Sequence, residues 1–204
     1  MIYTVTLDPI LERTVEIDEL IYDDVNLATN ERRCVRAKGI DVSRVIRELG
    51  GQSIATGIIG GYNGDEIEDI LTNEGISCEF AKVAPESGSR INILQKRKKL
   101  RTVIEVPVRA LDLDSMQHLI KALTGMPSGS IAVVSINPNE SPNKWCYWDL
   151  IRVFNENNIK VALDADGEDL KRGIEAGVYL IKPNIHDFGR LVGRNVTDTE
   201  EIVR

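Results

Sequence analysis

The chain has 204 residues, of which 42% are hydrophobic and 28% are charged, so it can form one large globular domain. The formal net charge of −7 argues against a general nucleic-acid-binding protein. Three separated cysteines without a CxxC pair and two histidines argue against a zinc site. The sequence shows neither a signal peptide nor an apolar run of roughly 18 residues, so we expect a cytoplasmic protein without a membrane partner.

Strand-like and helix-like segments alternate along most of the chain. The predicted strands span residues 2–7, 53–59, 131–134, 160–163 and 178–181. The predicted helices span about 40–49, 63–75, 112–124, 145–156 and 168–176, with another starting at 185. Repeated β-then-α units predict a parallel sheet covered by helices, with right-handed crossovers.

Capping signals mark several of the predicted helix starts. Asn63 and Glu66 form a capping-box pattern, and Asp112 precedes an apolar helical face. Thr197 and Glu200 form a further capping box only a few residues before the last residue. A parallel α/β sheet is not expected to finish on a helix that has just begun, so we interpret the chain as part of a longer protein.

Four segments interrupt the β–α alternation. Residues 12–18, 28–36, 89–95 and 101–106 read as paired strands, which predicts a small separate sheet inserted at about 12–36 and 89–106. The basic turn at 96–101 could attract phosphate or nucleic acid. The preferred interpretation is a charged, solvated hairpin tip, so no nucleic-acid partner is predicted.

A glycine turn before the first predicted helix is the most informative local feature. In Lys38-Gly39-Ile40-Asp41, Gly39 permits backbone angles that other residues resist. The helix N-terminus that follows suits an anion, and Lys38 adds a positive charge beside it. The same pattern also fits an ordinary loop-to-helix turn.

Together with two other regions, this turn resembles the ribokinase-like PfkB family of sugar kinases. The matching segments are residues 1–15, 38–44, and the pair 161–168 and 180–187. The resemblance is strongest to the 1-phosphofructokinase and tagatose-6-phosphate kinase branch. It implies an α/β fold whose ribokinase-like parallel sheet is flanked by helices and carries a small β-sheet lid. Residues 1–204 would form an incomplete kinase domain, its C-terminal part missing, and the lid implies a homodimer.

The resemblance implies a sugar-phosphate site. Its residues are Glu12, Lys38, Gly39, Asp41, Arg90 and Ser135. Glu12 stands where the family has an Asp that binds sugar hydroxyls, and Arg90 matches an arginine that contacts the substrate phosphate. Asp41 replaces an Asn, which keeps an acceptor but loses the amide donors. An arginine in a strand is also a common surface residue, so that alternative for Arg90 stays open.

One departure from the family pattern lies directly before Lys38. Arg36 and Ala37 replace what is usually a small, Gly-rich pair. A sugar approaches the backbone closely there, and the bulk of Arg36 would obstruct it. Alternatively, Arg36 binds a substrate phosphate as a bidentate fork.

The resemblance also implies ATP and Mg2+ as cofactors. Lys182, Asn184 and Asp187 match a Lys-Pro-Asn-x-x-Glu segment that organises Mg2+ and the phosphates of ATP, with Asp187 acting on the metal through water. Asn184 and Asp187 also read as a helix N-cap and its first-turn acid, and both roles can coexist. Asp164 and Asp166 end a predicted strand at the edge where α/β sheets bind ligands.

The implied activity is ATP-dependent phosphoryl transfer to a hydroxyl of a sugar phosphate similar to fructose 1-phosphate. The family's catalytic Asp belongs to a Gly-Ala-Gly-Asp turn that does not occur in the 204 residues, so no catalytic residue is predicted within this chain. The alternative is a catalytically inactive fragment that binds a sugar phosphate or dimerises.

Overall fold

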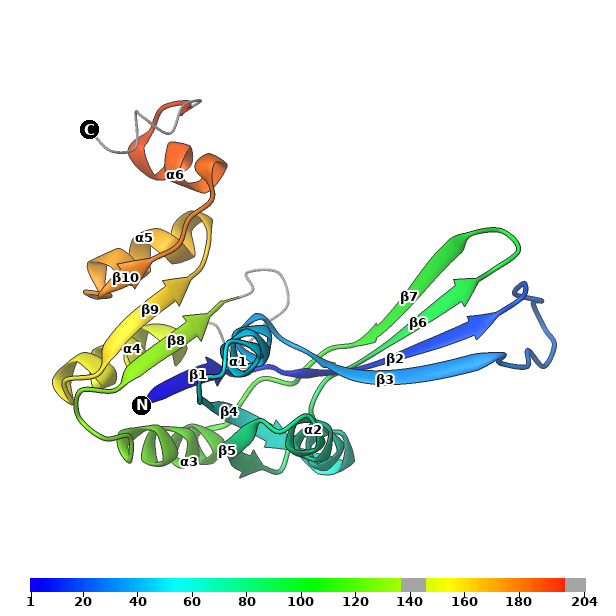
Figure 1. Ribbon diagram of the computed structural model, residues 1–204, viewed down its shortest axis with the longest axis horizontal. Helices are drawn as coiled ribbons and strands as arrows, with labels where there is room; N and C mark the ends of the chain where they lie inside the picture. The colour runs from blue at the N-terminus through cyan, green and yellow to red at the C-terminus, as the bar shows by residue number, and fades with distance from the viewer. Residues whose placement is uncertain (137–145, 197–204) are drawn as a thin grey trace.

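Two sheets make up the computed structural model, which describes residues 1–136 and 146–196 (Figure 1). The strands are β1 Ile2–Thr6, β2 Ile10–Ile17, β3 Asn30–Arg36, β4 Ile54–Gly60, β5 Ser77–Val83, β6 Ser89–Gln95, β7 Leu100–Val106, β8 Ile131–Ser135, β9 Lys160–Asp164 and β10 Leu180–Ile181. The helices are α1 Lys38–Glu48, α2 Gly61–Asn73, α3 Leu113–Thr124, α4 Cys146–Glu156, α5 Gly167–Glu175 and α6 Ile185–Val192.

The first sheet is parallel, with the strand order β10-β9-β8-β1-β4-β5. From β1 the chain builds outward through β4 to β5, and then returns to the other side of β1 to form β8. The order therefore reverses between β1 and β8. In open α/β sheets, ligands bind beyond the carboxyl ends of the strands at such a point. This confirms the predicted parallel α/β sheet and directs attention to the ends of β1 and β8.

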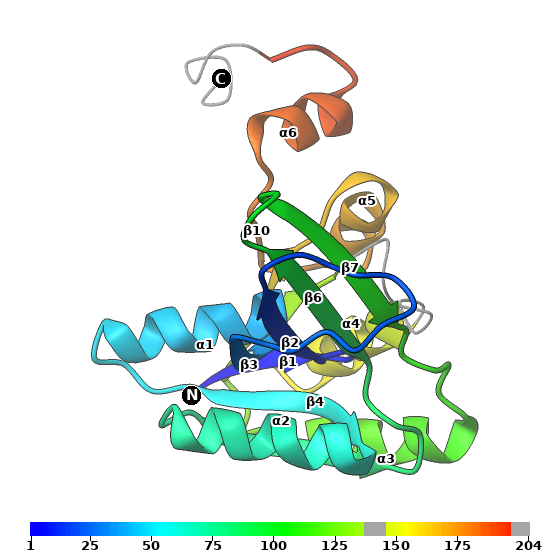
Figure 2. The ribbon, with the colours of Figure 1, turned by 90° about the vertical axis from the view of Figure 1, so that its right-hand side faces the viewer.

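Helices cover both faces of the parallel sheet. On one face, Ile40 of α1 and Ile67 of α2 pack with Ile59 of β4. On the other, Phe154 of α4 packs in a larger cluster with Ile58 of β4 and residues from α3 and α5. Neighbouring residues of β4 thus point to opposite faces, as strand geometry requires. Figure 2 shows α1 and α4 on opposite sides of the strands.

The second sheet has the order β3-β2-β6-β7 and projects from one end of the parallel layer (Figure 1). Its outer pairs are antiparallel, whereas its central pair, β2 with β6, is parallel. The expectation of a small additional sheet is confirmed. We call it the lid sheet.

Some local expectations differ from the structure. Strand β5 was not among the predicted strands, because its exposed edge position gives it charged residues such as Glu79 and Lys82 in place of an apolar run. The capping box of Asn63 with Glu66 is wrong: α2 begins at Gly61, and the Asn63 N–H donates to Glu86 Oε1 at 2.6 Å instead. The Asp112 cap is confirmed, since Asp112 Oδ1 accepts from the Ser115 N–H at 2.8 Å.

Two expectations fall partly or wholly outside the described residues. They are the capping box of Thr197 and Glu200 and the beginning of the helix predicted at 145–156. Within the part of the chain that the structure describes, no helix has the length and apolarity needed to span a bilayer.

Candidate functional site

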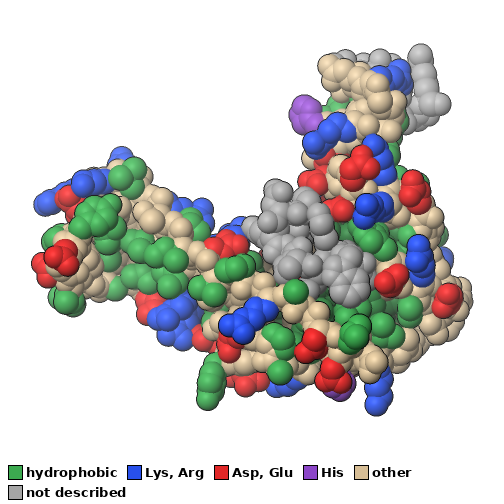
Figure 3. Space-filling view, turned by 180° about the vertical axis from the view of Figure 1, so that it is seen from behind, with side chains coloured by type: hydrophobic (Ala, Val, Ile, Leu, Met, Phe, Trp, Pro, Cys, Tyr) green, Lys and Arg blue, Asp and Glu red, His purple; other side chains and the backbone are tan. Residues whose placement is uncertain are grey.

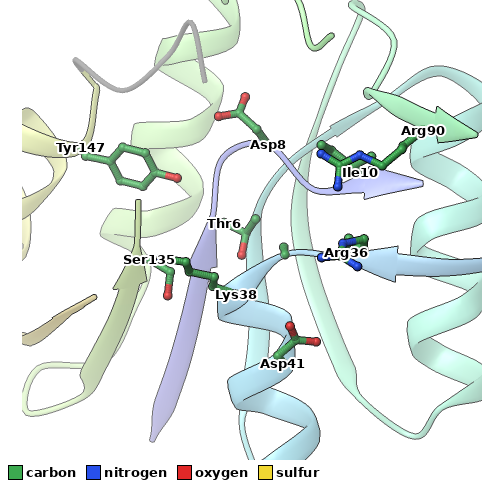
Figure 4. Close-up of a pocket in the computed structure, with 10 residues that line it drawn as sticks. Thr6, Asp8, Ile10, Arg36, Lys38, Asp41, Arg90, Ser135 and Tyr147 are labelled. Atoms are coloured by element: carbon green, nitrogen blue, oxygen red, sulfur yellow. The ribbon is translucent and has the colours of Figure 1, made fainter. Parts of the chain in front are cut away.

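A cavity of about 190 Å3 lies where the strand order reverses, between the parallel sheet and the base of the lid sheet (Figure 4). The carboxyl ends of β1 and β8 provide Thr6 and Ser135. The lid sheet provides Arg36 and Arg90. The remaining lining residues are Asp8, Ile10, Ala37, Lys38, Asp41 and Tyr147.

Helix α1 points its N-terminus into this cavity. Its N-cap residue, Ala37, has extended backbone and supplies no side-chain cap. Gly39 does not adopt a positive φ, so the expectation that it provides unusual backbone angles is wrong. Close approach requires the glycine instead, because a Cβ at Gly39 would lie 2.6 Å from Thr6 Oγ1 and 3.3 Å from the Val5 carbonyl oxygen.

Two arginines flank the buried carboxylate of Glu12. Arg36 Nε lies 3.5 Å and Arg90 Nη1 lies 4.0 Å from Glu12 Oε2. Arg90 is held from its other side by Glu105, whose Oε2 accepts from Nε and Nη2 at 2.7 and 2.6 Å. The Arg90 side chain is only 12% exposed. Its guanidinium is therefore fixed within the lid sheet while it lines the cavity.

Cys34 lies on the other side of Glu12. Its Sγ is 3.9 Å from Glu12 Oε1. Burial, followed by the nearby Glu12 carboxylate, raises the pKa of the Cys34 thiol above its usual range. The thiol therefore stays neutral beside Glu12 at ordinary pH, and the two arginines supply the positive charge next to this carboxylate.

Asp41, in the first turn of α1, is oriented by Arg44. Arg44 Nη1 donates to Asp41 Oδ1 at 2.8 Å and to the Val35 carbonyl at 3.0 Å. The same guanidinium donates to both oxygens of Glu74, at 2.7 and 3.0 Å, and hydrogen bonding to Glu74 raises the pKa of Arg44. Arg44 thus fastens α1 to the end of β3, which carries Arg36 into the cavity.

Lys38 connects the cavity to the carboxyl end of β9. Lys38 Nζ lies 3.6 Å from Asp164 Oδ2, and Lys182 Nζ lies 3.7 Å from Asp164 Oδ1. Asp164 therefore stands between two lysines, one from the cavity and one from the segment that follows β10.

Comparison with known proteins identifies the family. The sequence profile described as pfkB family carbohydrate kinase matches residues 14–204. The chain belongs to this family. It is 28% identical to the 1-phosphofructokinase of Bacillus subtilis over 208 residues, covering 100% of this chain and 66% of that protein. It is 32% identical to the D-tagatose-1-phosphate kinase of Bacillus licheniformis over 203 residues, covering 98% and 65%.

Solved structures share the fold. Phosphofructokinase-2 from Escherichia coli, determined in complex with fructose-6-phosphate, superposes with a TM-score of 0.81 at 24% identity, covering 99% of this chain and 67% of the other. This pfkB chain spans about two thirds of the length of the curated relatives that it matches.

The residues expected to bind the nucleotide in this pfkB chain do not line the cavity, although Lys182 shares Asp164 with the cavity residue Lys38. Asn184 caps α6, since its Oδ1 accepts from the Asp187 N–H at 2.9 Å, so the expected N-cap is confirmed. Asp187 is buried and its carboxylate pairs with Arg190. Lys182 is largely exposed. Among the described residues, no group of three or more His, Cys, Asp or Glu could hold a metal ion.

Of the six residues predicted to bind the sugar phosphate, four line the cavity: Lys38, Asp41, Arg90 and Ser135. Gly39 does not line the cavity but packs against Thr6, which does. Glu12 does not line it either, but its Oε2 lies within 4.0 Å of the lining residues Arg36 and Arg90. Sequence reasoning missed Thr6 and Tyr147. Thr6 gave a signal, because it is a hydroxyl at the carboxyl end of a predicted parallel strand. Tyr147, whose Oη accepts from the Leu7 N–H at 3.3 Å, gave none, because it reads as one apolar residue of a helix.

Proposed function

We propose that this chain supplies the sugar-phosphate site of a kinase that transfers the terminal phosphoryl group of ATP to a hydroxyl of a phosphorylated ketohexose. The observation that carries this proposal is the arginine pair in the cavity. Arg90, held by Glu105 through Nε and Nη2, lines the cavity as a fixed cation that suits a phosphate, and Arg36 adds a second cation beside it. Names of the relatives, which include 1-phosphofructokinase, support the same substrate class.

The other lining residues suit the sugar itself. Asp8 and Asp41 offer carboxylate oxygens that can accept from hydroxyls, and Lys38 can donate. In this proposal Glu12 mainly orients Arg36 and Arg90, because both guanidinium groups face its Oε2. The bulk of Arg36 narrows the cavity where the family is usually Gly-rich, so the bound sugar contacts a guanidinium there instead of bare backbone.

ATP and Mg2+ belong to the proposal as cofactors. Mg2+ keeps several waters and binds few carboxylates beside the phosphates of a nucleotide, which fits an indirect role for Asp187 through water. Lys182 and Asn184 would face the nucleotide phosphates. Because Asn184 already caps α6 and Asp187 already pairs with Arg190, both would act from fixed positions.

The lid sheet offers a surface for a second copy of the chain. Residues paired directly across strands share a face of a sheet, so Val15, Ile91, Ile93, Ile104 and Val106 lie on one side. Ile104 and Val106 are 50% and 56% exposed. Figure 3 shows hydrophobic side chains gathered on the projecting lid sheet. An exposed apolar patch of this kind suits a protein partner, so we propose a homodimer formed through the lid sheet. A dimerising sugar-phosphate-binding module without phosphoryl transfer is therefore the second candidate.

Calorimetry with fructose 1-phosphate, fructose 6-phosphate and unphosphorylated fructose tests the proposed substrate class. Arg90→Ala removes a charge-assisted contact, and we expect phosphorylated sugars to bind about tenfold to hundredfold more weakly while fructose changes little. Arg33→Ala is the matched control, since Arg33 lies in the same sheet but pairs with Glu31 and Glu66 outside the cavity. Equal losses for fructose and its phosphates, or no loss for any of them, would contradict the proposal.

A further inference from the structure

The segment that leads from β5 into β6 is hydrogen-bonded to the N-terminus of α2. The Ser87 N–H donates to the Gly60 carbonyl at 2.8 Å, and the Gly60 N–H donates to Ser87 Oγ at 3.0 Å. Asn63 Nδ2 donates to the Ser87 carbonyl at 2.9 Å, and the Asn63 N–H donates to Glu86 Oε1 at 2.6 Å. We call these four residues, Gly60, Asn63, Glu86 and Ser87, the α2 clasp.

Within the α2 clasp, Glu86 supplies the cap that the helix itself lacks. The N-cap residue of α2 is Gly60, which has no side chain, and the first turn contains no acidic residue. A helix N-terminus favours a carboxylate, because its first N–H groups are unpaired and the helix dipole is positive there. The Glu86 carboxylate lies directly against this turn, since a Cβ at Gly61 would collide with its Oε2. Gly61 also has a φ of +65°, so both space and backbone require glycine at this position.

The α2 clasp lies behind the wall of the candidate site. A small second cavity, of about 10 Å3, is lined by Gly60, Glu86 and Ser87 of the clasp and also by Asp8. Asp8 lines the larger cavity of the candidate site as well. The residue between the two cavities is therefore one that the proposed function assigns to the bound sugar.

The α2 clasp also leads directly into the strand that carries Arg90. Arg90 is the second residue of β6, and Ser87 precedes that strand by two positions. Glu105 holds the Arg90 guanidinium, but Glu105 belongs to the lid sheet and cannot fix Arg90 relative to the parallel sheet. The clasp can do so, because Gly60 is the last residue of β4 in the parallel sheet.

We infer that Glu86 is a positioning residue: by closing the α2 clasp it holds the start of β6 against the end of β4 and keeps Arg90 in place for the substrate phosphate. This inference rests on the proposed function, since Arg90 is the group that Glu86 positions. Glu86 does not line the larger cavity, so it acts on the sugar phosphate only through β6. Glu86 is exposed, so truncating it leaves the apolar core of the parallel sheet intact.

Calorimetry with fructose 1-phosphate and with unphosphorylated fructose tests this role. Glu86→Ala removes one hydrogen bond of the clasp, so we expect fructose 1-phosphate to bind about threefold to tenfold more weakly and fructose to bind as in the wild type. Glu86→Gln keeps an oxygen that can accept from the Asn63 N–H and should restore most of the affinity. Asp65→Ala is the matched control, because it removes a carboxylate from the same end of α2 that pairs with Lys82 instead.

Hydrogen exchange of the Asn63 amide, measured by NMR, reports directly on the clasp. We expect this amide to exchange faster in Glu86→Ala than in the wild type, Glu86→Gln or Asp65→Ala. If Glu86→Ala does not fold, Glu86→Asp carries the same test, because its shorter side chain keeps the charge but draws it away from Asn63.

Three results would overturn the inference and leave the proposed function standing. They are an unchanged affinity of Glu86→Ala for fructose 1-phosphate, an equal loss of affinity in Asp65→Ala, and an Asn63 amide that exchanges no faster in Glu86→Ala. An equal loss of affinity for fructose and fructose 1-phosphate would also overturn it, since Arg90 would then not be the group affected. A wild type that binds no sugar phosphate would instead overturn the proposed function, and this inference with it.

Discussion

The parallel sheet and the lid sheet are stabilised by different means. In the parallel sheet, Val5, Ala55 and Val134 are fully buried between two layers of helices. In the lid sheet, β7 is exposed along its whole length, and ion pairs such as Arg13 with Glu31 and Lys96 with Glu16 connect neighbouring segments. Exposed ion pairs contribute little to stability, whereas apolar burial contributes most of it. The comparison teaches that apolar burial stabilises the parallel layer, whereas the outer strand of the lid sheet leaves apolar and charged side chains exposed.

The largest expected difference between the two sheets is in the effect of a core truncation. Phe154→Ala removes a fully buried ring that packs on the parallel sheet and should lower the free energy of unfolding by about 3–5 kcal/mol. Ile104→Ala, on the half-exposed face of β7, should lower it by less than about 1 kcal/mol. Urea denaturation at low protein concentration measures both. Equal losses would show that the lid sheet is a second folding core.

A charge on the lid sheet should change association more than stability. Ile104→Lys places a charge on the exposed apolar face at the edge strand β7, so we expect a dimer to become a monomer that unfolds at a similar urea concentration. Light scattering after gel filtration gives the mass. Val45→Lys, at a comparably exposed apolar position on α1, should leave the dimer intact. A monomeric wild type, or a dimer that survives Ile104→Lys, would exclude this face as the interface.

A helix cap at the edge of the parallel sheet should have a smaller effect. Asn184→Ala removes the cap of α6 and should cost about 1 kcal/mol, whereas Asn184→Asp keeps an acceptor and most of the stability. Affinity for ATP separates the two roles of Asn184. If Asn184→Asp retains stability and ATP binding alike, the side chain serves only as a cap.

The smallest expected effect concerns one thiol from each sheet. Burial, followed by Glu68 and Glu74, raises the pKa of Cys78 in β5 to about 11. A raised thiol pKa lowers the thiolate fraction at a given pH, to about 1% at pH 9 for Cys78, and reactivity increases only as pH rises through that value. Cys34 in β3, with a smaller upward shift of its pKa, should be alkylated first by iodoacetamide. Peptide mass spectrometry between pH 8 and pH 10 measures the order of alkylation. Alkylation of Cys78 before Cys34 would show that burial at β5 does not control thiol reactivity.

Sequence patterns predicted the parallel layer well because its strands and helices carry apolar residues at the spacing that is typical of each. Ile131 to Val134 is a continuous apolar run, as expected for a strand with helices on both faces. Edge strand β5 lacks that run, and so it was missed. The N-terminus of α2 was misplaced because its first-turn partner, Glu86, comes from a distant loop that no local pattern reveals.

The residues that the family resemblance placed in the candidate site lie in the cavity where they follow a strand or begin a helix. Lys38, Asp41 and Ser135 occupy such places, and all three line the cavity. The sequence alone did not reveal which strands are neighbours in the lid sheet. Glu12 lies between two arginines because β3 and β6 flank β2. The fit of Gly39 against Thr6 likewise depends on the crossing of α1 over β1.

The parallel pairing of β2 with β6 has a consequence for how the chain folds. The two strands pair residue 11 with residue 89, and β3, α1, β4, α2 and β5 lie between them in sequence. Strands β2 and β6 can therefore pair only after the intervening segment has been synthesised and has folded. Pairings between such distant segments are slow to form, and until β6 arrives the β2 edge stays open to other chains.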